Sequence, residues 1–284
     1  MVSKALPKNG QLAELIRILT SNFLIECIYR SDFHESAEHT ALVLLVSNKY
    51  VHTIGEITPK MVNSIKHFDN YHIKCFVAFQ TKEKIKKGNL FLYCTCQPEN
   101  LLYQNPDSEF SPIPNNFNPS ECFALFEDRQ EREAKKINEF KNGYFHFKAN
   151  SNLSIAAFMI HQVLEQTYRN LEIILTGKDK ITHSIRSHNL TLQKIYPYDN
   201  PVFDLDHIAD NKLLLTLEEI YRATRYEDDF QISLETLDRI EQKMNVLCEL
   251  FEKIYSKINI EFRNKYLNIN QQHTADATPV ETFR

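Results

Sequence analysis

The first hundred residues alternate between short apolar runs and segments with helical periodicity. Runs rich in β-branched and aromatic side chains predict strands at four places: residues 23–30, 40–47, 72–80 and 89–96. The last run is predicted to be a strand or an equivalent apolar element. Near-continuous apolarity over 41–46 favours a central strand for that segment, because such a strand is covered on both faces.

Helices are predicted between these runs at three places: 11–21, 58–68 and 81–87. We expect Pro59 at the first helical position of the second helix, and Gly88 ends the third. The polar segment 31–39, which carries several carboxylates, is expected to be a loop between two strands. Strands and helices that alternate in this way predict a small α/β sheet.

The second half of the chain has helical periodicity throughout. Long helices with one apolar face are predicted at four places: 127–149, 152–176, from Asp210 and from Ser233. We expect Asn150 or Ser151 to cap the second of these helices and Gly177 to end it. A short helix is expected at 188–196. Four long helices with one-sided apolar faces predict an up-down bundle.

The predicted fold class is α+β with two domains. Residues 97–122 hold prolines interleaved with asparagine and serine, which predicts a connector without regular structure and a domain boundary near 115–125. The chain then divides into four parts: an α/β domain over 1–115, a linker over 116–126, a helical bundle over 127–267 and a tail over 268–284. The tail has little apolar surface to bury, so we expect it to be disordered.

Composition narrows the class of protein. The 284 residues are 43% hydrophobic and 25% charged, as in packed globular proteins. The sequence offers no run near the roughly 20 apolar residues that cross a bilayer and no signal peptide at its start, so we expect a cytoplasmic protein without a membrane partner. Cations are spread along the chain and the net charge is −4. A broad nucleic-acid surface, which needs clustered cations, is therefore not expected.

Neither a metal nor a cofactor is expected. The six cysteines are scattered among apolar runs, which indicates reduced, buried thiols. Cys94 and Cys96 would share one face of a strand, as half of a metal site requires, but no second Cys or His pair has matching spacing. The five glycines are dispersed, so the sequence holds no glycine-rich phosphate loop.

The helical half also carries three motifs in order, within 156–177, 187–195 and 220–232. They are a Gln–Glu pair ahead of a Thr-Gly helix end, a His-Asn-Leu element and an Arg-Tyr turn: Gln162, Glu165, Thr176-Gly177, His188-Asn189-Leu190 and Arg225-Tyr226. In this order and at these separations they resemble a HEPN domain over about 127–267. The resemblance implies a homodimer formed through the helical half and a toxin–antitoxin, defence or stress setting.

The order of elements in 11–97 is similar to a minimal nucleotidyltransferase domain, which often precedes a HEPN domain. That enzyme class needs Gly-Ser after its first strand and paired aspartates on its second, because two carboxylates hold a divalent metal against the triphosphate. Here Arg30-Ser31 stands in place of Gly-Ser, and Ala41 and Val43 stand in place of the aspartates. Asp32, Glu35 and Glu38 lie in the predicted loop, which is a poor scaffold for metal geometry. We infer a degenerate domain that no longer transfers nucleotides.

Some HEPN domains resemble ribonucleases that use an arginine and a histidine with four to six residues between them. The histidine would act as general acid or base and the arginine would stabilise the phosphorane. No arginine of this chain has that spacing: Arg30 and His34 are separated by three residues, Arg186 and His188 by one. A metal-independent ribonuclease is therefore the alternative hypothesis, and it requires a composite site across a dimer.

The leading hypothesis is a noncatalytic, dimerising HEPN-like protein that binds a nucleotide, an RNA or another anionic ligand. The candidate ligand-binding residues are polar side chains near one groove: His161, Glu165, His188, Arg222, Arg225 and Tyr226. Each also has a structural interpretation. His161 and Glu165 could form helix ion pairs, and His188 could cap a helix or bond a backbone carbonyl. The carboxylates that follow Tyr226 could neutralise the arginines, and Arg225 could bridge to Glu165. A protein–protein scaffold is the second alternative.

Overall fold

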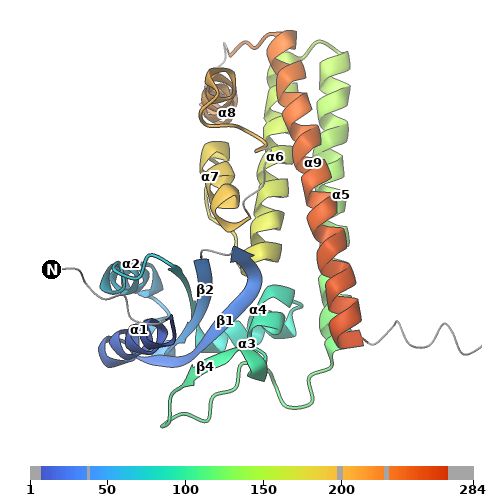
Figure 1. The fold of residues 1–284 in the computed structure, drawn as a ribbon. Coiled ribbons are helices and arrows are strands. Elements are labelled where there is room, and N and C mark those ends of the chain that lie inside the picture. The colour runs from blue at the N-terminus through green and yellow to red at the C-terminus, as the bar shows by residue number, and fades with distance from the viewer. Residues whose placement is uncertain (1–7, 37–38, 197–200, 227–229, 268–284) are drawn as a thin grey trace, which may run out of the picture.

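In the computed structural model, the residues described are 8–36, 39–196, 201–226 and 230–267. They form an α+β fold, with a four-strand mixed sheet and its helices in residues 10–104 and a helical region from 119 to 267 (Figure 1). This architecture confirms the predicted fold class. Within the described ranges, none of the helices combines the length and the apolar character that crossing a bilayer requires.

The sheet has the strand order β3-β2-β1-β4. Its strands are β1 (Ile25–Ser36), β2 (His39–Val46), β3 (Tyr71–Val77) and β4 (Leu101–Gln104). β1 pairs antiparallel with both β2 and β4, whereas β2 and β3 are parallel. β3 and β4 are therefore the two edges, and β2 is a central strand as its apolar sequence predicts.

Helices cover both faces of this sheet (Figure 1). They are α1 (Lys8–Asn22), α2 (Ile54–Ser64), α3 (Ala78–Lys86) and α4 (Leu90–Thr95). Leu42 and Leu44 of β2 pack with α1 and α2, while Val43 and Leu45 pack with α3 and α4, and all four are fully buried. Successive side chains of a strand point to opposite faces, so a strand covered on both sides has to be apolar throughout.

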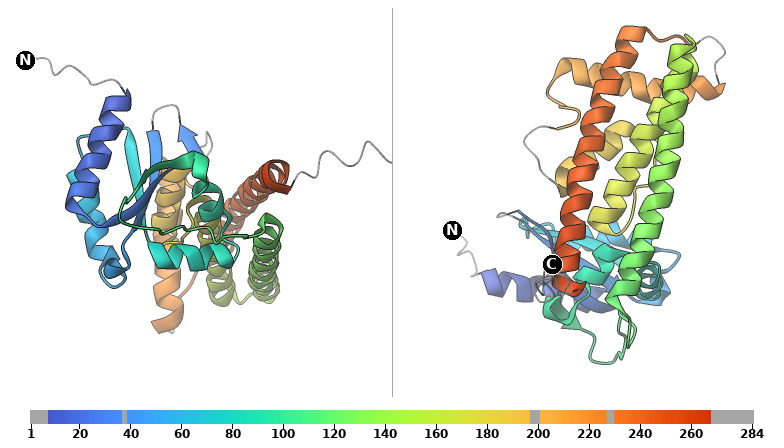
Figure 2. Two further views of the ribbon diagram at one scale, coloured as in Figure 1. Left: turned by 90° about the horizontal axis from the view of Figure 1, so that it is seen from below. Right: turned by 90° about the vertical axis from the view of Figure 1, so that its right-hand side faces the viewer.

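The helical region is built around α6. Its helices are α5 (Pro119–Ala149), α6 (Leu153–Thr176), α7 (Ile185–Ile195), α8 (Ile208–Tyr226) and α9 (Leu234–Phe262), with a final turn over Arg263–Leu267. The long helices α5, α6 and α9 run side by side, and α7 and α8 pack on the remaining side of α6 (Figures 1 and 2). Because neighbours surround it, most of α6 is buried, including several polar side chains.

Helix ends follow their local chemistry. The Ser233 side chain accepts a hydrogen bond from the backbone N–H of Thr236, so the predicted cap of α9 is confirmed. Gly177 ends α6 in the left-handed conformation with φ +77°, as predicted. The cap of α6 is Asn152 rather than Asn150 or Ser151, because only the Asn152 side chain reaches the backbone N–H of Ile155.

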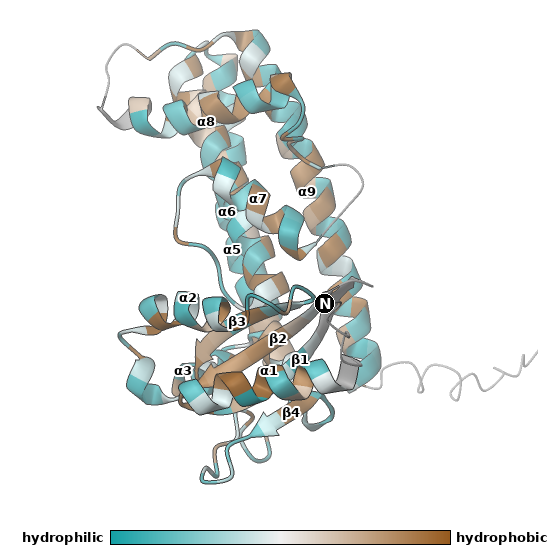
Figure 3. Ribbon diagram, turned by 60° about the vertical axis from the view of Figure 1, so that its left-hand side comes forward, coloured by the Kyte–Doolittle hydropathy of each residue, from teal (hydrophilic) through white to brown (hydrophobic). Residues whose placement is uncertain are grey.

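One hydrophobic cluster extends from the sheet into the helical region. It includes one face of β1 and β2, the buried side of α4, and the inner faces of α5, α6 and α9. A smaller cluster lies on the opposite face of the sheet, beneath α1 and α2. Figure 3 shows the hydrophobic strands between helices whose outer sides are hydrophilic. The sheet and the helices are therefore joined through α4, which contacts both β1 and α6.

The structure differs from prediction at two places after β3. Of the two alternatives for 89–96, the strand is wrong: Leu90–Thr95 form the helix α4, because the Asn89 side chain caps it and accepts from the backbone N–H of Leu92. Nearly every side chain of this short helix is buried, so its sequence has no amphipathic period that would distinguish it from a strand. The predicted connector contains β4, a four-residue edge strand that pairs with β1.

Other element boundaries also differ from prediction. α2 begins at Ile54, so Pro59 lies inside the helix, since apolar residues at helical spacing continue upstream of the proline. The predicted loop 31–39 is mostly hairpin, with β1 reaching Ser36 and β2 starting at His39. Position 38, with its carboxylate, and the predicted tail 268–284 lie outside the described residues.

In the helical region, three helices begin earlier than predicted, and the predicted cap of α8 was misassigned. α5 begins at Pro119, where the Asn118 side chain accepts from the backbone N–H of Ser120. α7 begins at Ile185 and is capped by Ser184. Asp210 is in the first turn of α8 and does not cap it. Its carboxylate accepts from Lys243 Nζ at 2.5 Å and from the backbone N–H of Asp204 at 2.9 Å.

Candidate functional site

α6 carries three ionisable side chains that are almost completely buried: His161, Glu165 and Glu172. Charged side chains are rarely buried in this way unless a partner satisfies them, because removal from water is costly. The partners come from the segment that folds back after α6, between residues 178 and 188. This segment and α6 together form the polar centre of the helical region.

Glu165 is covered by His183. Both carboxylate oxygens of Glu165 lie 3.1 Å from His183 Nδ1, and His161 Nε2 lies 3.1 Å from the carbonyl oxygen of His183. The His183 ring is stacked on Tyr221 of α8, with centroids 4.1 Å apart and an interplanar angle of 15°. The His183 side chain is 54% exposed, so it separates the buried carboxylate from solvent.

Glu172 and His188 form a second buried pair. His188 Nδ1 lies 2.9 Å from Glu172 Oε1, and Nε2 lies 3.1 Å from the carbonyl oxygen of Thr182. Both ring nitrogens therefore face oxygen atoms. The second carboxylate oxygen of Glu172 accepts from the backbone N–H of Lys180 at 2.7 Å. The network fixes the segment after α6 to the helix.

These contacts place the residues that the sequence singles out. His161, Glu165 and His188 lie in the polar centre, buried and bonded to neighbours. Arg222 lies on the exposed side of α8. Arg225 and Tyr226 belong to the last turn of α8, and their side chains, including the predicted bridge from Arg225 to Glu165, lie outside what the structure describes.

Arg169 of α6, one helical turn after Glu165, pairs with Asp179. Its Nη2 lies 2.6 Å and its Nε 2.9 Å from Asp179 Oδ2, and its Nη1 lies 3.7 Å from Glu165. The sequence did not identify Tyr221 as part of the polar centre or Glu172 as the partner of His188. Residue spacing could not have revealed them, because the contacts depend on how the segment after α6 folds back.

Ala41 and Val43, the residues at which the sequence resemblance expects aspartates, are part of the core. Val43 is fully buried and Ala41 is 8% exposed. Ser31, at the end of the paired part of β1, is buried and its Oγ lies 3.5 Å from Thr95 Oγ1. In the portion of the chain with assigned positions, no three His, Cys, Asp or Glu side chains gather as a metal site would require.

Cys94 and Cys96 do not form half of a metal site on α4. Side chains two positions apart point to different sides of a helix, whereas on a strand they would point to the same face. Burial raises the pKa of the Cys94 thiol to about 12 and that of Cys96 well above its usual value. The thiolate is the form that binds metals, so burial disfavours coordination at both positions.

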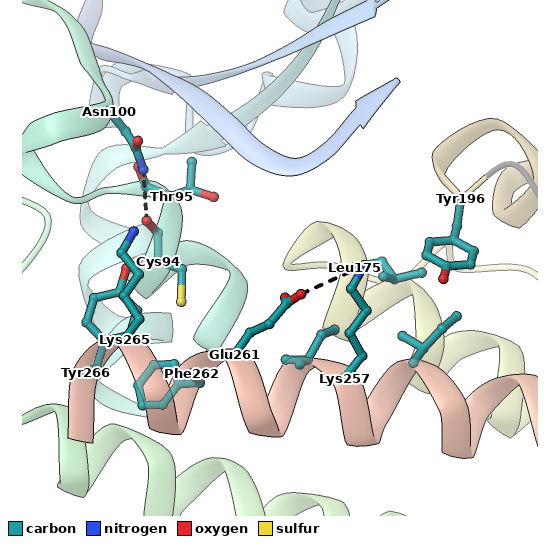
Figure 4. A pocket seen from close by; sticks show the side chains of 12 residues that line it. Cys94, Thr95, Asn100, Leu175, Tyr196, Lys257, Glu261, Phe262, Lys265 and Tyr266 are labelled. Carbon is teal, nitrogen blue, oxygen red and sulfur yellow. Dashed lines mark hydrogen bonds and ion pairs between the residues drawn. The ribbon is translucent and has the colours of Figure 1, made fainter. Parts of the chain in front are cut away.

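A cavity of about 220 Å³ lies between α4 and α9 (Figure 4). Its floor is apolar and consists of Leu175, Ile254, Ile258 and Phe262. Polar side chains surround this floor: Thr95, Asn100, Tyr196, Lys257, Glu261, Lys265 and Tyr266, with the Cys94 thiol at the α4 side. A cavity with an apolar floor and a few polar groups at its edge is the usual form of a small-molecule site.

The charged side chains at the edge of this cavity form only weak ion pairs. Lys257 lies 3.8 Å from Glu261 and Lys265 lies 3.3 Å from Glu99, and all four side chains are more than half exposed. Exposed ion pairs of this kind contribute about 0–1 kcal/mol, so both lysines can exchange partners. The Tyr266 hydroxyl is buried beside the Cys94 thiol, and burial raises its pKa. It therefore remains a protonated donor.

The fold and these sites define an α+β protein with a polar centre on α6 and a separate amphipathic cavity between α4 and α9. No protein-family model and no curated protein sequence matches the chain.

Proposed function

We propose that this chain is a noncatalytic binding protein that combines a degenerate nucleotidyltransferase-like domain with a HEPN-like helical bundle. The order of strands and helices supports the first part, and the motifs within α6, α7 and α8 support the second. The burial of Ala41 and Val43 supports the loss of nucleotidyl transfer, because carboxylates at these positions would lie in the apolar core.

The observation that carries the proposal is the cavity between α4 and α9. We expect it to hold a nucleotide-type ligand, with the base on the floor of Ile258 and Phe262 and the phosphates near Lys257 and Lys265. Tyr266 supplies a hydroxyl donor whose neighbour is the Cys94 thiol, a weak acceptor that a ligand oxygen could replace. The predicted groove at His161, Glu165 and His188 is a weaker candidate, because these side chains are buried and already bonded.

The helical region would also form the homodimer. Large apolar side chains are exposed on α8 and α9, including Leu215, Leu234, Val246 and Ile260. Burying such residues against a second copy would remove apolar surface from water, which is the main favourable contribution to association. Light scattering is expected to give twice the chain mass for the wild type, and a monomer at the same concentration would remove this part of the proposal.

Thermal unfolding of the full chain with AMP, ADP and ATP tests the ligand proposal. A nucleotide at 100 times its Kd should add about 2.7 kcal/mol to the free energy of unfolding. We expect Lys257→Ala to weaken the response, and the matched variant Lys253→Ala to keep it, since Lys253 is exposed on α9 and does not line the cavity. No shift with any nucleotide would favour a protein–protein scaffold.

A ribonuclease is tested by incubating the chain with labelled RNA in EDTA, because that mechanism needs no metal. No cleavage is expected. Both ring nitrogens of His188 are bonded to other groups, and the Arg186 guanidinium donates to Asn211 Oδ1 at 2.9 Å. Neither residue is therefore available for acid–base work or phosphorane stabilisation. Cleavage by the purified wild type would overturn the noncatalytic proposal.

A further inference from the structure

Three lysines from different elements meet at the edge of the sheet below the end of α6. Lys74 lies in β3, Lys84 lies in α3, and Lys178 follows Gly177 at the end of α6. Lys74 Nζ is 5.1 Å from the centroid of the Phe91 ring. Lys178 Nζ and Lys84 Nζ are 5.0 Å and 5.4 Å from the centroid of the Phe76 ring. We call Lys74, Lys84 and Lys178 the lysine cluster.

Phe76 and Phe91 form the platform that holds the lysine cluster. The two rings are linked through Gly177, where an added Cβ would lie 2.8 Å from Phe91 Cδ1 and 3.4 Å from Phe76 Cζ. Gly177 is itself held in place, because the Asn89 side chain donates to its carbonyl oxygen at 2.9 Å. Aromatic faces attract ammonium groups without neutralising their charge. The platform therefore positions the lysines and leaves their charge available.

The charges around the lysine cluster are unbalanced. None of the three lysines forms an ion pair with a residue that the structure describes. Lys178 Nζ donates a hydrogen bond to the carbonyl oxygen of Cys75 at 3.4 Å. The acidic group nearby is Asp179, whose carboxylate is engaged by Arg169. Arg129 of α5 adds a further positive charge near Lys84.

The lysines oppose one another's charge. Burial, with a smaller contribution from the charge of Lys178, lowers the pKa of Lys74 to about 8. Burial also lowers the pKa of Lys84 and of Lys178, and Lys178 contributes to the effect on Lys84. Charges brought together without a counter-ion are unfavourable in the free protein, and they become favourable when an anion binds between them.

We propose that the lysine cluster is a binding site for a small phosphate-bearing anion with two or more negative charges. Three ammonium groups supply several charge-assisted hydrogen bonds to phosphate oxygens, which is the chemistry by which lysine recognises phosphate. The site shares no residue with the cavity between α4 and α9, so it stands independently of the nucleotide proposal. The anion can be free, or it can be the phosphate part of a larger molecule.

Titration of the full chain with inorganic pyrophosphate tests the site, with thermal unfolding and calorimetry as readouts. We expect the midpoint of unfolding to rise with pyrophosphate and to remain unchanged with adenosine, which has no phosphate. Lys178→Gln and Lys74→Met should each weaken binding by about tenfold or more. Lys87→Gln is the matched control, since Lys87 is exposed just after α3 and outside the lysine cluster. Lys257→Ala should also leave pyrophosphate binding unchanged.

A second readout separates a binding site from a purely structural cluster. Without anion, Lys74→Met should unfold at the same temperature as the wild type or higher, because it removes a repelled charge, while it loses the pyrophosphate response. An equal rise with sodium chloride at matched ionic strength would show screening alone and overturn the proposal. An undiminished response in both lysine variants, or no response in the wild type, would overturn it too. Binding of ATP without binding of pyrophosphate would place the phosphate site at the α4–α9 cavity and overturn the proposal for the lysine cluster.

Discussion

Charged residues gather at two places along α6, and the structure treats them differently. Within the helix, Glu165 and Glu172 are buried, and His183 and His188 bond to their carboxylates. Beyond the end of the helix, Lys178 joins other cations and the described residues give it no carboxylate partner. The first group fixes the segment after α6 to the helix, whereas the second leaves positive charge available for a bound anion.

This difference distinguishes structural from ligand-binding polar groups better than residue type does. A buried carboxylate and the histidine bonded to it satisfy each other. Removing either partner leaves the other buried group uncompensated. A cation in the lysine cluster can be removed with little loss in the free protein, because its neighbours repel it. Variants at the two places should therefore have opposite effects on stability, and the following predictions test that contrast from the largest effect to the smallest.

Glu172→Ala should destabilise the protein by about 3–5 kcal/mol, because it leaves the buried His188 ring without its carboxylate partner. It also removes the acceptor for the backbone N–H of Lys180. Urea unfolding followed by circular dichroism measures the change. The control Glu219→Ala, on the exposed side of α8, should stay within about 0.5 kcal/mol of the wild type. A loss below about 1 kcal/mol for Glu172→Ala would show that the pair contributes little to stability.

Gly177→Ala should destabilise by about 1–3 kcal/mol and remove the response to pyrophosphate. The residue has φ +77°, and its new Cβ would meet the Phe91 ring that supports Lys74. Gly55→Ala is the matched control, because nothing lies within 4 Å of the added Cβ and the residue is helical. That control should be neutral or slightly stabilising. A Gly177→Ala chain that still binds pyrophosphate would separate the end of α6 from the lysine cluster.

Much of the fold follows from the sequence because strong periodic patterns match buried faces. The apolar stripe of α6 and the Gly177 stop placed that helix to within a residue at each end. β2 was recognisable because both its faces are covered. α4 and β4 were missed, since a short buried helix has no visible period and a four-residue edge strand depends on pairing with β1. Local sequence carries little information about either.

The sites were less predictable for the same reason. The sequence singles out His161 and Glu165 as polar residues within an apolar helix. It does not reveal that His183 contacts both of them. The lysine cluster joins residues 74, 84 and 178, which have no spacing in common. The sequence therefore indicated where polar groups are unusual, and only the tertiary structure shows which of them are satisfied.

His183→Ala should destabilise by about 1–2 kcal/mol, less than Glu172→Ala, because His183 is half exposed and water can reach the Glu165 carboxylate in its absence. The variant also loses the stacking of His183 on Tyr221. His67→Ala, at an exposed position after α2, controls for loss of a surface histidine. Urea unfolding of both variants gives the comparison, and equal stabilities would show that His183 does not close over Glu165.

The smallest predicted effect is the pH dependence that Lys74 contributes. Its pKa in the folded chain is about 8, below the ordinary value of 10.5, so above pH 8 the unfolded state binds more protons than the folded state. Stability contributed by this group therefore rises as pH increases from 8 towards 10.5, by about 1 kcal/mol between pH 7.5 and 9.

The buried thiols of Cys27 and Cys75 oppose this trend at higher pH, because their pKa is raised from 9.0 to about 11 and stability falls between these values. The test is therefore the difference between the wild type and Lys74→Met, with Lys87→Met as control. Lys178, Lys84, Arg129 and Asp179 are the other charged groups around the cluster, and they are unchanged in both variants. We expect the free energy of unfolding of the wild type to increase relative to that of Lys74→Met as pH rises. Pyrophosphate should abolish this increase, because it keeps Lys74 protonated. Parallel stability profiles for the two chains would mean that Lys74 keeps an ordinary pKa, and that its charge is not opposed by the rest of the cluster.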